Sequence, residues 1–313
     1  MDIRVRRLEE KDLLTADLIR RMAFGTFLGV PEPEKFGEDT DHIKARWLAD
    51  PNAAFAAEIN GKLVGTNLAT RWGSFGFFGP LTVHPDFWDR GVAKSLLNPT
   101  MQLFSEWGVR HAGLFTFAHS PKHLGLYEKF GFWPRFLTPL MTRAVNPKEN
   151  SDNWSKFSEV PEVDRRHALD LCRNVTCSVY DGLDVEREIL SVQNQNLGDT
   201  VLLWEGKTLV GLAVCHCGAG TEAGRDLCYV KFAAMRKATG AESNFERLLD
   251  ACNALAIEHG MSSVFAGVNT ACHDAYRRMI DRGFRTEFQG VLMLNPNEFA
   301  FDCPENYVLC DLR

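Results

Sequence analysis

The amino-acid sequence predicts a mixed α/β protein made of two tandem modules, each with a mostly antiparallel central sheet flanked by helices. Three observations support this fold class. Segments with strand-like composition alternate with segments whose apolar residues recur at helical spacing. An Asn-Gly pair separates two of the strand segments, which is typical of an antiparallel hairpin. The order of these elements is then repeated in the second half of the chain.

The composition agrees with two folded domains. The chain has 313 residues, of which 45% are hydrophobic and 24% are charged, which is enough for two domains with apolar cores. No apolar run reaches the length of a membrane span. The first segment, MDIRVRRLEEKDL, lacks the apolar stretch of a secretory signal. We therefore expect a cytoplasmic protein without a membrane partner.

The first elements follow in chain order. Residues 3–8 (IRVRRL) predict a strand, and the next segment predicts a helix with one apolar face at Leu13, Leu14, Leu18 and Met22. Residues 53–72 predict two strands joined at Asn60-Gly61, because this pair tolerates the positive φ of a tight turn. Residues 76–85 (GFFGPLTVHP) predict a third strand.

A helix is expected next, from Gly91 to about Trp107, because five apolar residues share one face: Val92, Leu96, Leu97, Met101 and Phe104. Pro99 lies inside this helix and should kink it, because proline removes one backbone hydrogen bond. Residues 111–117 (HAGLFTF) then predict a strand.

The second half repeats this order. An offset of 152 residues places three landmarks on their counterparts: Gly108 on Gly260, Leu96-Leu97 on Leu248-Leu249, and Gly131-Phe132 on Gly283-Phe284. The hairpins correspond at a shorter offset, so the second copy should have a longer loop at residues 218–226. A polar stretch with two prolines places the boundary near residues 145–155. We predict modules of residues 1–145 and 155–313.

The cysteines indicate reduced, buried thiols. All nine lie after residue 171, in odd number and without regular spacing, unlike a disulfide framework. The CHC sequence at residues 215–217 ends an apolar run and has no second cluster of matching spacing. Structural zinc needs four well-spaced ligands. We therefore expect a core strand there and no metal site.

Charge is unevenly distributed. Residues 1–145 contain 18 basic and 16 acidic residues, a net charge of +2, which leaves −8 for the remainder of a chain of net charge −6. The first module is therefore the better host for a phosphate-bearing ligand. Nothing resembles a basic stripe or an RNA-reading aromatic motif, so we expect no nucleic-acid partner.

Residues 84–97 (HPDFWDRGVAKSLL) can form a phosphate cradle. A strand ending near Val83 and a helix beginning near Gly91 would direct unpaired backbone N–H groups and the positive end of the helix dipole at one point. Small residues leave space for a phosphate and two cations add positive charge: Gly91, Ala93, Arg90 and Lys94. From these residues alone, an ordinary strand-to-helix turn is an equal alternative.

Together with residues 120–132 (SPKHLGLYEKFGF), this segment resembles the GNAT superfamily of acyl-CoA-dependent N-acetyltransferases. The loop of that family has Gln or Arg, any two residues, Gly, any residue, and Gly or Ala; here it is residues 88–93 (WDRGVA). The family also has a tyrosine four residues before a Gly-Phe pair, which corresponds to Tyr127 before Gly131-Phe132. The resemblance covers residues 3 to about 143, and the second copy matches more loosely.

The resemblance implies an acetyl-CoA site and an N-acetyltransferase. Backbone groups would bind pantetheine, the loop would cradle the pyrophosphate, and a serine at the usual Asn position would contact the cofactor near the thioester. The residues implied are Leu81, Val83, Trp88, Asp89, Arg90, Gly91, Val92, Ala93, Lys94, Ser95 and Ser120. The acetyl group would pass directly to an amine of a small molecule or peptide in a ternary complex. We expect a monomer or homodimer.

The resemblance assigns Tyr127 as the general acid that protonates the CoA thiolate; the structural alternative is packing of its ring against Phe130 or Phe132. The general base is less visible. His84 has a suitable ordinary pKa, but a turn residue before Pro85 is the simpler interpretation. Asp86, Glu58 and water-mediated deprotonation are the other candidates.

Two departures matter. Trp88 occupies the slot where the family usually has Gln or Arg, and an indole offers only one donor. In the second copy, the 152-residue offset replaces Gly91 by Ser243 and Tyr127 by Met279. We therefore expect a degenerate second module that supports the first and walls its substrate cleft.

The alternative function is a non-catalytic acyl-CoA-binding or interaction protein. The acceptor is not defined, although some aromatic residues could line a cleft: Phe24, Phe27, Phe75, Phe77 and Phe78.

Overall fold

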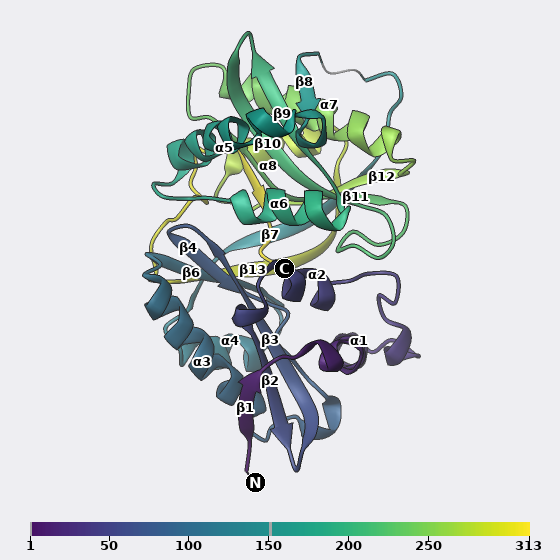
Figure 1. Cartoon of the computed structure of the whole chain (residues 1–313), viewed down its shortest axis with the longest axis vertical. Coiled ribbons are helices and arrows are strands. Elements are labelled where there is room, and N and C mark those ends of the chain that lie inside the picture. The colour runs from purple at the N-terminus through teal and green to yellow at the C-terminus, as the bar shows by residue number, and fades with distance from the viewer. Residues whose placement is uncertain (1, 150–151) are drawn as a thin grey trace.

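A computed structural model describes residues 2–149 and 152–313 (Figure 1). The first half of the chain contributes helices α1 (Leu13–Leu28), α2 (Ile43–Ala49), α3 (Val92–Trp107) and α4 (Pro121–Glu128), and strands β1 (Arg4–Arg7), β2 (Ala54–Ile59), β3 (Lys62–Trp72), β4 (Phe75–Phe78), β5 (Thr82–Val83), β6 (His111–Thr116) and β7 (Trp133–Ala144). The second half contributes helices α5 (Arg165–Val179), α6 (Glu186–Gln195), α7 (Ala241–Glu258) and α8 (His273–Asp281), and strands β8 (Trp154–Lys156), β9 (Gly198–Glu205), β10 (Thr208–Cys217), β11 (Leu227–Met235), β12 (Ser263–Gly267), β13 (Arg285–Asn295) and β14 (Val308–Cys310).

The two halves share a single mixed sheet of 14 strands. Its path runs β1-β2-β3-β4-β6-β13-β7-β12-β11-β10-β9-β8, with β5 paired to β3 and β14 paired to β11 off this path. The halves exchange strands at the centre, because β13 lies between β6 and β7, and β7 pairs with β12. Helices cover the sheet in both halves (Figure 1). The predicted fold class is confirmed, and the two central sheets are joined into one.

The predicted hairpin is confirmed. Strands β2 and β3 pair antiparallel around Asn60 and Gly61, whose φ angles are 51° and 75°. Both angles are left-handed, which suits Asn and Gly better than other residues. The strands at residues 3–8 and 111–117 are also present, as β1 and β6.

Two sequence expectations for the first half were wrong in detail. The apolar face assigned to α1 faces outward, since Leu14 is 87% and Leu18 is 42% exposed. The helix instead buries a face that contains Ala16, Ile19 and Ala23. The third strand is also not continuous. It ends at Phe78 and resumes at Thr82, because Pro80 supplies no ladder donor.

The duplication extends to the element boundaries. Strand β12, helix α8 and strand β13 start at residues 263, 273 and 285, which is 152 residues after β6, α4 and β7. The start of α7 departs from this offset. Gly240 precedes α7 as Gly91 precedes α3, with φ angles of 84° and 82°. The alignment of Gly91 with Ser243 was therefore wrong, because the connection before α7 is shorter than the one before α3.

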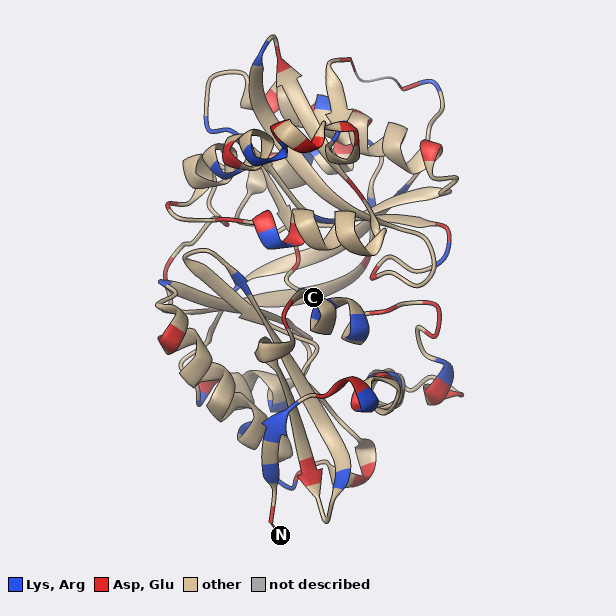
Figure 2. Ribbon diagram, in the orientation of Figure 1, with Lys and Arg blue, Asp and Glu red and all other residues tan. Residues whose placement is uncertain are grey.

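Most thiols are buried in the second half. All nine cysteines are free, six buried and three half-buried. Residues 215–217 end strand β10, as expected of a core strand. In Figure 2, acidic and basic residues are interspersed on the helices and turns of both halves. Within the part of the chain that the structure describes, no helix combines the length and apolar character that a membrane crossing requires.

The predicted boundary near residues 145–155 falls between β7 and β8. Residues 150 and 151 of that segment lie outside the described residues. The division into modules 1–145 and 155–313 stays a prediction, because the sheet itself runs through both halves.

Candidate active site

A cavity of about 1050 Å³ opens in the first half, next to the junction with the second. Its lining comes from α1, the segment between α1 and α2, the β4–β5 region, the start of α3, the end of β6, α4, and several residues of the second half. Of the residues predicted for the site, it includes Leu81, Val83, Trp88, Asp89, Gly91, Val92, Ala93, Lys94 and Tyr127. The fold thus brings most of the predicted site together.

The interruption after β4 creates a gap in the sheet. Strand β4 pairs with β6 in parallel from Phe75 to Phe77, whereas β5 pairs only with β3. His84 donates its backbone N–H to the Val64 carbonyl of β3. In an antiparallel pair, successive residues direct their backbone groups alternately toward the partner strand and away from it. The backbone groups of Val83 and Leu81 therefore face the open side of β5. A ligand with amide groups can bind there as an extra strand.

The loop before α3 and the first turn of that helix border the same cavity. Asp89 has a φ of 61° and Gly91 a φ of 82°, so the chain turns sharply before α3 begins at Val92. The first turn of α3 contains no acidic residue. The N–H groups at this helix start and the positive end of its dipole favour an anionic group, such as a phosphate.

The structure explains the unusual Trp88. Its indole N–H donates to the backbone carbonyl of Val83 over 2.7 Å, so the side chain closes the turn that links β5 to α3. The Lys122 ammonium lies 5.6 Å from the Trp88 ring centroid and 2.6 Å from the Asp89 carboxylate. Lys122 also lines the cavity and adds a cation at the rim of the loop.

Tyr127 is a buried tyrosine on the wall of this cavity. It lines the cavity, is 7% exposed, and packs its ring against Phe78 with 5.8 Å between centroids. Burial raises the pKa of the phenol, and a hydrogen bond with the Thr116 side chain opposes this shift. Thr116 ends β6, beside the gap. The phenol therefore holds its proton at neutral pH.

Four predicted residues are not among those that line the cavity: His84, Arg90, Ser95 and Ser120. His84 accepts the Asp86 backbone N–H through Nδ1 over 3.3 Å, as a turn residue would. The Arg90 guanidinium lies over the Phe87 ring, and the Ser95 hydroxyl bonds to the Gly91 carbonyl. Ser120 caps helix α4 by accepting from the backbone N–H of His123.

The other base candidates are engaged elsewhere. Glu58 accepts two hydrogen bonds from Arg6, at 2.8 and 2.6 Å. The Asp86 carboxylate is exposed and lies 3.7 Å from His84. Neither residue lines the cavity.

The second half closes one end of the cavity. Its longer loop, residues 218–226, docks against residues 39–41: Gly220 donates to the Asp39 carbonyl, and Arg225 donates its backbone N–H to the Asp39 carboxylate. This loop carries Glu222 and Ala223 to the cavity, and Phe288 of β13 joins them. The sequence could flag the loop as an insertion, but it could not show what the loop touches.

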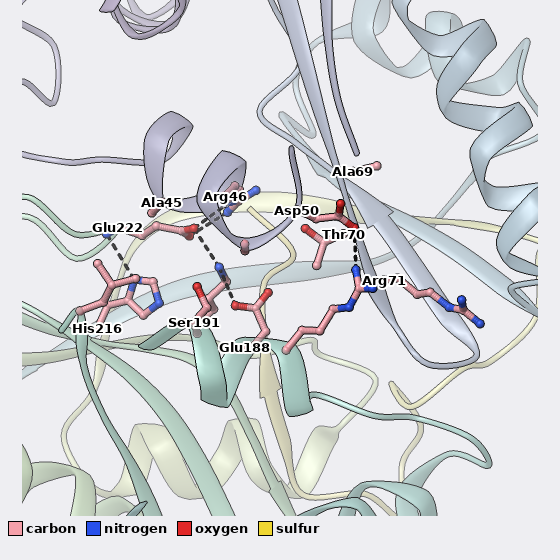
Figure 3. Close-up of a pocket in the computed structure, with 14 residues that line it drawn as sticks. Ala45, Arg46, Asp50, Ala69, Thr70, Arg71, Glu188, Ser191, His216 and Glu222 are labelled. Atoms are coloured by element: carbon pink, nitrogen blue, oxygen red, sulfur yellow. Dashed lines mark hydrogen bonds and ion pairs between the residues drawn. The ribbon is translucent and has the colours of Figure 1, made fainter. Parts of the chain in front are cut away.

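Glu222 is the centre of a buried charge network between the halves (Figure 3). Its carboxylate binds Arg46 of α2 at 2.8 and 2.7 Å and Lys231 of β11 at 2.8 Å. Arg46 also donates to the Gly79 carbonyl, beside the gap, and Lys231 contacts Glu188 at 3.1 Å. A cavity of about 20 Å³ within this network has room for one water molecule.

Two buried histidines flank this network. Burial is the main cause that lowers the pKa of His42 to about 4 and that of His216 to about 3; nearby cations act in the same direction, and the Glu222 carboxylate opposes them. His42 Nδ1 lies 3.7 Å from the Glu222 carboxylate, and His42 lines the large cavity. Both imidazoles are therefore neutral at physiological pH.

Aromatic residues form the remaining wall. Phe24, Phe27 and Phe78 line the cavity, whereas Phe75 and Phe77 belong to the core of the sheet. Sequence reasoning missed Phe36, Phe117 and Phe288, which come from three separate segments. Among residues 2–149 and 152–313, no group of His, Cys, Asp and Glu is arranged to hold a metal ion.

Comparison with known proteins shows related sequences and folds. The profile of the Acetyltransferase (GNAT) family matches residues 17–132. An acetyltransferase from Pectobacterium atrosepticum is 31% identical over 107 residues, which cover 34% of this chain and 76% of that protein.

Solved structures extend the similarity over both halves. A chain from Pyrococcus horikoshii has a TM-score of 0.70 at 13% identity, covering 98% of this chain and 94% of that chain. A GCN5-related N-acetyltransferase from Sphaerobacter thermophilus has a TM-score of 0.60 at 16% identity, covering 93% and 95%. At these identities the likeness concerns the fold alone.

Proposed function

Because the chain belongs to the acetyltransferase (GNAT) family, we propose that it transfers the acetyl group of acetyl-CoA directly to an amine within a ternary complex. One observation carries this proposal: the gap between β5 and β6, the start of α3 and the Tyr127 side chain all border the same cavity. Members of this family use acyl-CoA as co-substrate.

The proposed cofactor contacts follow from this arrangement. Pantetheine would pair with the outward-facing backbone groups of Leu81 and Val83, although the Val83 carbonyl also accepts the Trp88 indole N–H. The pyrophosphate would accept hydrogen bonds from the backbone N–H groups of residues 89–94. Arg90, Ser95 and Ser120 lie outside the cavity lining. Arg90 would contribute only through its backbone, whereas the N–H and hydroxyl of Ser95 both bond to the Gly91 carbonyl and Ser120 caps α4.

The proposed reaction needs one proton donor at the sulfur. The free amine attacks the thioester carbonyl carbon, a C–N bond forms, and the C–S bond breaks. Tyr127 gives its proton to the departing thiolate, and the attacking nitrogen loses a proton to water. The Tyr127 phenolate then regains a proton from water, which closes the cycle. His84, proposed as a base from the sequence, gains no support from its position in the turn.

We also propose that the second module is degenerate and binds no CoA. In the first half, the side of Leu81–Val83 that faces away from β3 is open to a ligand. In the second half, β14 takes the corresponding position by pairing with residues 232–234 of β11. Met279 stands at the position of Tyr127 and is fully buried. The loop before α7 is also shorter than the one before α3.

Two measurements test these proposals. Thiol release from acetyl-CoA with a panel of amines should exceed the rate without amine. Calorimetric titration should give one CoA per chain. Tight CoA binding without thiol release from any amine would favour the non-catalytic acyl-CoA-binding alternative, and two CoA per chain would contradict the degenerate second module.

A further inference from the structure

The end of the cavity formed by α1 and the second half is walled by half-buried phenylalanines. They are Phe24, Phe27, Phe36, Phe117 and Phe288. Phe27 and Phe117 have ring centroids 4.5 Å apart, and Phe117 and Phe288 have centroids 5.5 Å apart. Phenylalanines of a core are normally covered on all sides. Here each ring leaves part of its surface facing one shared space.

This wall is continuous with the reaction centre. Phe117 directly follows Thr116, whose side chain contacts the Tyr127 phenol. The His123 ring of α4 lies 4.9 Å from Phe27 and extends the wall toward Tyr127. A molecule whose nitrogen reaches the thioester would therefore place the rest of its body among these rings.

The charged side chains that line this end are already paired within the protein. Arg20 binds the Asp17 carboxylate and the Gly37 carbonyl, at 2.9 Å each. Glu222 is held by Arg46 and Lys231. Arg313 lies 4.2 Å above the Tyr229 ring and contacts Asp311. A second ammonium of the acceptor would have to displace one of these partners.

We infer that the acceptor is an amine carried on an uncharged aromatic body, with the ring held among Phe24, Phe27, Phe117 and Phe288. The inference rests on the proposed acetyl transfer. Aromatic rings pack with offset or edge-to-face geometry at these spacings, and burial in such a wall is favourable. An apolar wall also favours the neutral amine over the ammonium, and the neutral form is the nucleophile.

This composition disfavours polycationic acceptors. A polyamine or a lysine-rich peptide would bring further positive charges to a wall whose one carboxylate, Glu222, is neutralised by two cations. A long acyl chain on CoA is the competing occupant of the same space. The experiment below separates these possibilities.

The test compares amines at fixed acetyl-CoA. 2-Phenylethylamine and tryptamine should have kcat/KM values at least about thirtyfold above those of ethanolamine and spermidine, because burial of a ring stabilises the complex. Equal values for all four amines would overturn the inference while leaving acetyl transfer intact. A rate that rises with acyl length from acetyl-CoA to hexanoyl-CoA, without preference for aromatic amines, would assign the cavity to the acyl chain and overturn it too.

Variants locate the ring-binding wall. Phe27→Ala should raise KM for 2-phenylethylamine about tenfold and leave the KM for acetyl-CoA unchanged. Phe299→Ala is the matched control, since Phe299 is 46% exposed, stacks on Phe136 and does not line the cavity. CoA affinity, measured by calorimetry, reports whether each variant folds.

Two further outcomes are decisive. If Phe27→Ala binds CoA normally and its KM for 2-phenylethylamine equals that of Phe299→Ala, the assigned wall is wrong. If CoA binds but no amine releases thiol, the proposed function fails and the inference with it.

Discussion

At the scale of single residues, two side chains of the first half stand out: Trp88 closes the turn before α3, and Tyr127 is a protonated phenol on the cavity wall. The Trp88 indole bonds to the Val83 carbonyl and thereby braces the loop from the protein side. A Gln or Arg at this position would leave a longer, more flexible side chain. Tyr127 is the complementary feature: buried against Phe78 and open to the cavity, it retains its proton.

Replacing Tyr127 by Phe tests the acid. The substitution removes one hydroxyl and keeps the ring packing, so CoA affinity should change little. The loss of proton transfer should lower kcat by about a hundredfold or more. Steady-state thiol release with the best amine measures this. Tyr276→Phe, in α8 and outside the cavity lining, is the control and should keep wild-type kcat. A Tyr127→Phe enzyme with unchanged kcat would remove Tyr127 from the mechanism.

The two buried histidines make stability depend on pH. Their pKa values are about 4 (His42) and about 3 (His216), below the ordinary 6.5. Between the folded-state pKa values and 6.5, the unfolded chain binds more protons than the folded one. The free energy of unfolding should therefore fall as the pH is lowered below 6.5. Urea titrations between pH 7 and 5 measure the slope.

A histidine variant isolates this effect. His42→Asn should reduce the slope, because it removes one of the imidazoles whose pKa is lowered in the folded chain, a group that also includes His111, His123 and His216. The exposed His167→Asn should keep the wild-type slope. Identical slopes for both variants would mean that His42 carries no part of the pH dependence.

At the scale of elements, α3 and α7 begin in the same way, but the strands beside their first turns differ. Gly91 and Gly240 both precede a helix with left-handed backbone. Before α3, the loop spans residues 84–91 and faces an open gap beside β5. Before α7, it spans residues 236–240, and β11 runs without interruption to meet β14. Only the first arrangement leaves room for an extended ligand.

The two glycines form a matched pair of variants. Gly91→Ala and Gly240→Ala should each cost about 1 kcal/mol of unfolding free energy, because both positions require a left-handed residue. Gly91→Ala should also weaken CoA binding about tenfold, or about 1.4 kcal/mol, since its backbone strain shifts the N–H groups of the loop. Calorimetry with CoA measures both variants. Equal CoA affinity in the two would argue against the cradle.

At the scale of the whole molecule, strand exchange and the Glu222 network bind the halves into one body. Strand β13 of the second half completes the sheet beside β6, and β7 of the first half extends the second. Arg46, Glu222, Lys231 and Glu188 then alternate in charge across the junction. Because Arg46 also holds the Gly79 carbonyl, the second half supports the gap of the first.

Glu222→Gln tests the junction. The substitution leaves two buried cations with a weaker partner, and breaking a buried pair of this kind costs about 3–5 kcal/mol. Chemical denaturation should therefore show a large loss of unfolding free energy. The control is Glu305→Gln, which removes the exposed pair with Lys237 and should cost no more than about 1 kcal/mol. Equal losses would show that the Glu222 network does not stabilise the junction.

Local features of this chain could be predicted from the sequence because short-range physics decides them. The Asn60-Gly61 turn and the glycine before α3 follow from nearby residues. The duplicated order of elements follows because the same local patterns recur at one offset. The resemblance at residues 88–93 and at Tyr127 identified the candidate site in the same way. The outward face of α1 was missed, since Ala16, Ile19 and Ala23 form a second apolar stripe, and periodicity does not decide which stripe is buried.

Only the tertiary structure decided how distant segments meet. The exchange of β7 and β13, the pairing of β14 with β11, and the gathering of Phe27, Phe117 and Phe288 join residues more than seventy positions apart. Strand register and partner choice depend on the burial of whole faces, which no local pattern specifies. The sequence by itself therefore determined the family and singled out residues 88–93 and Tyr127 as candidates for the cofactor site. Long-range packing decided the shape of the cavity that these residues share.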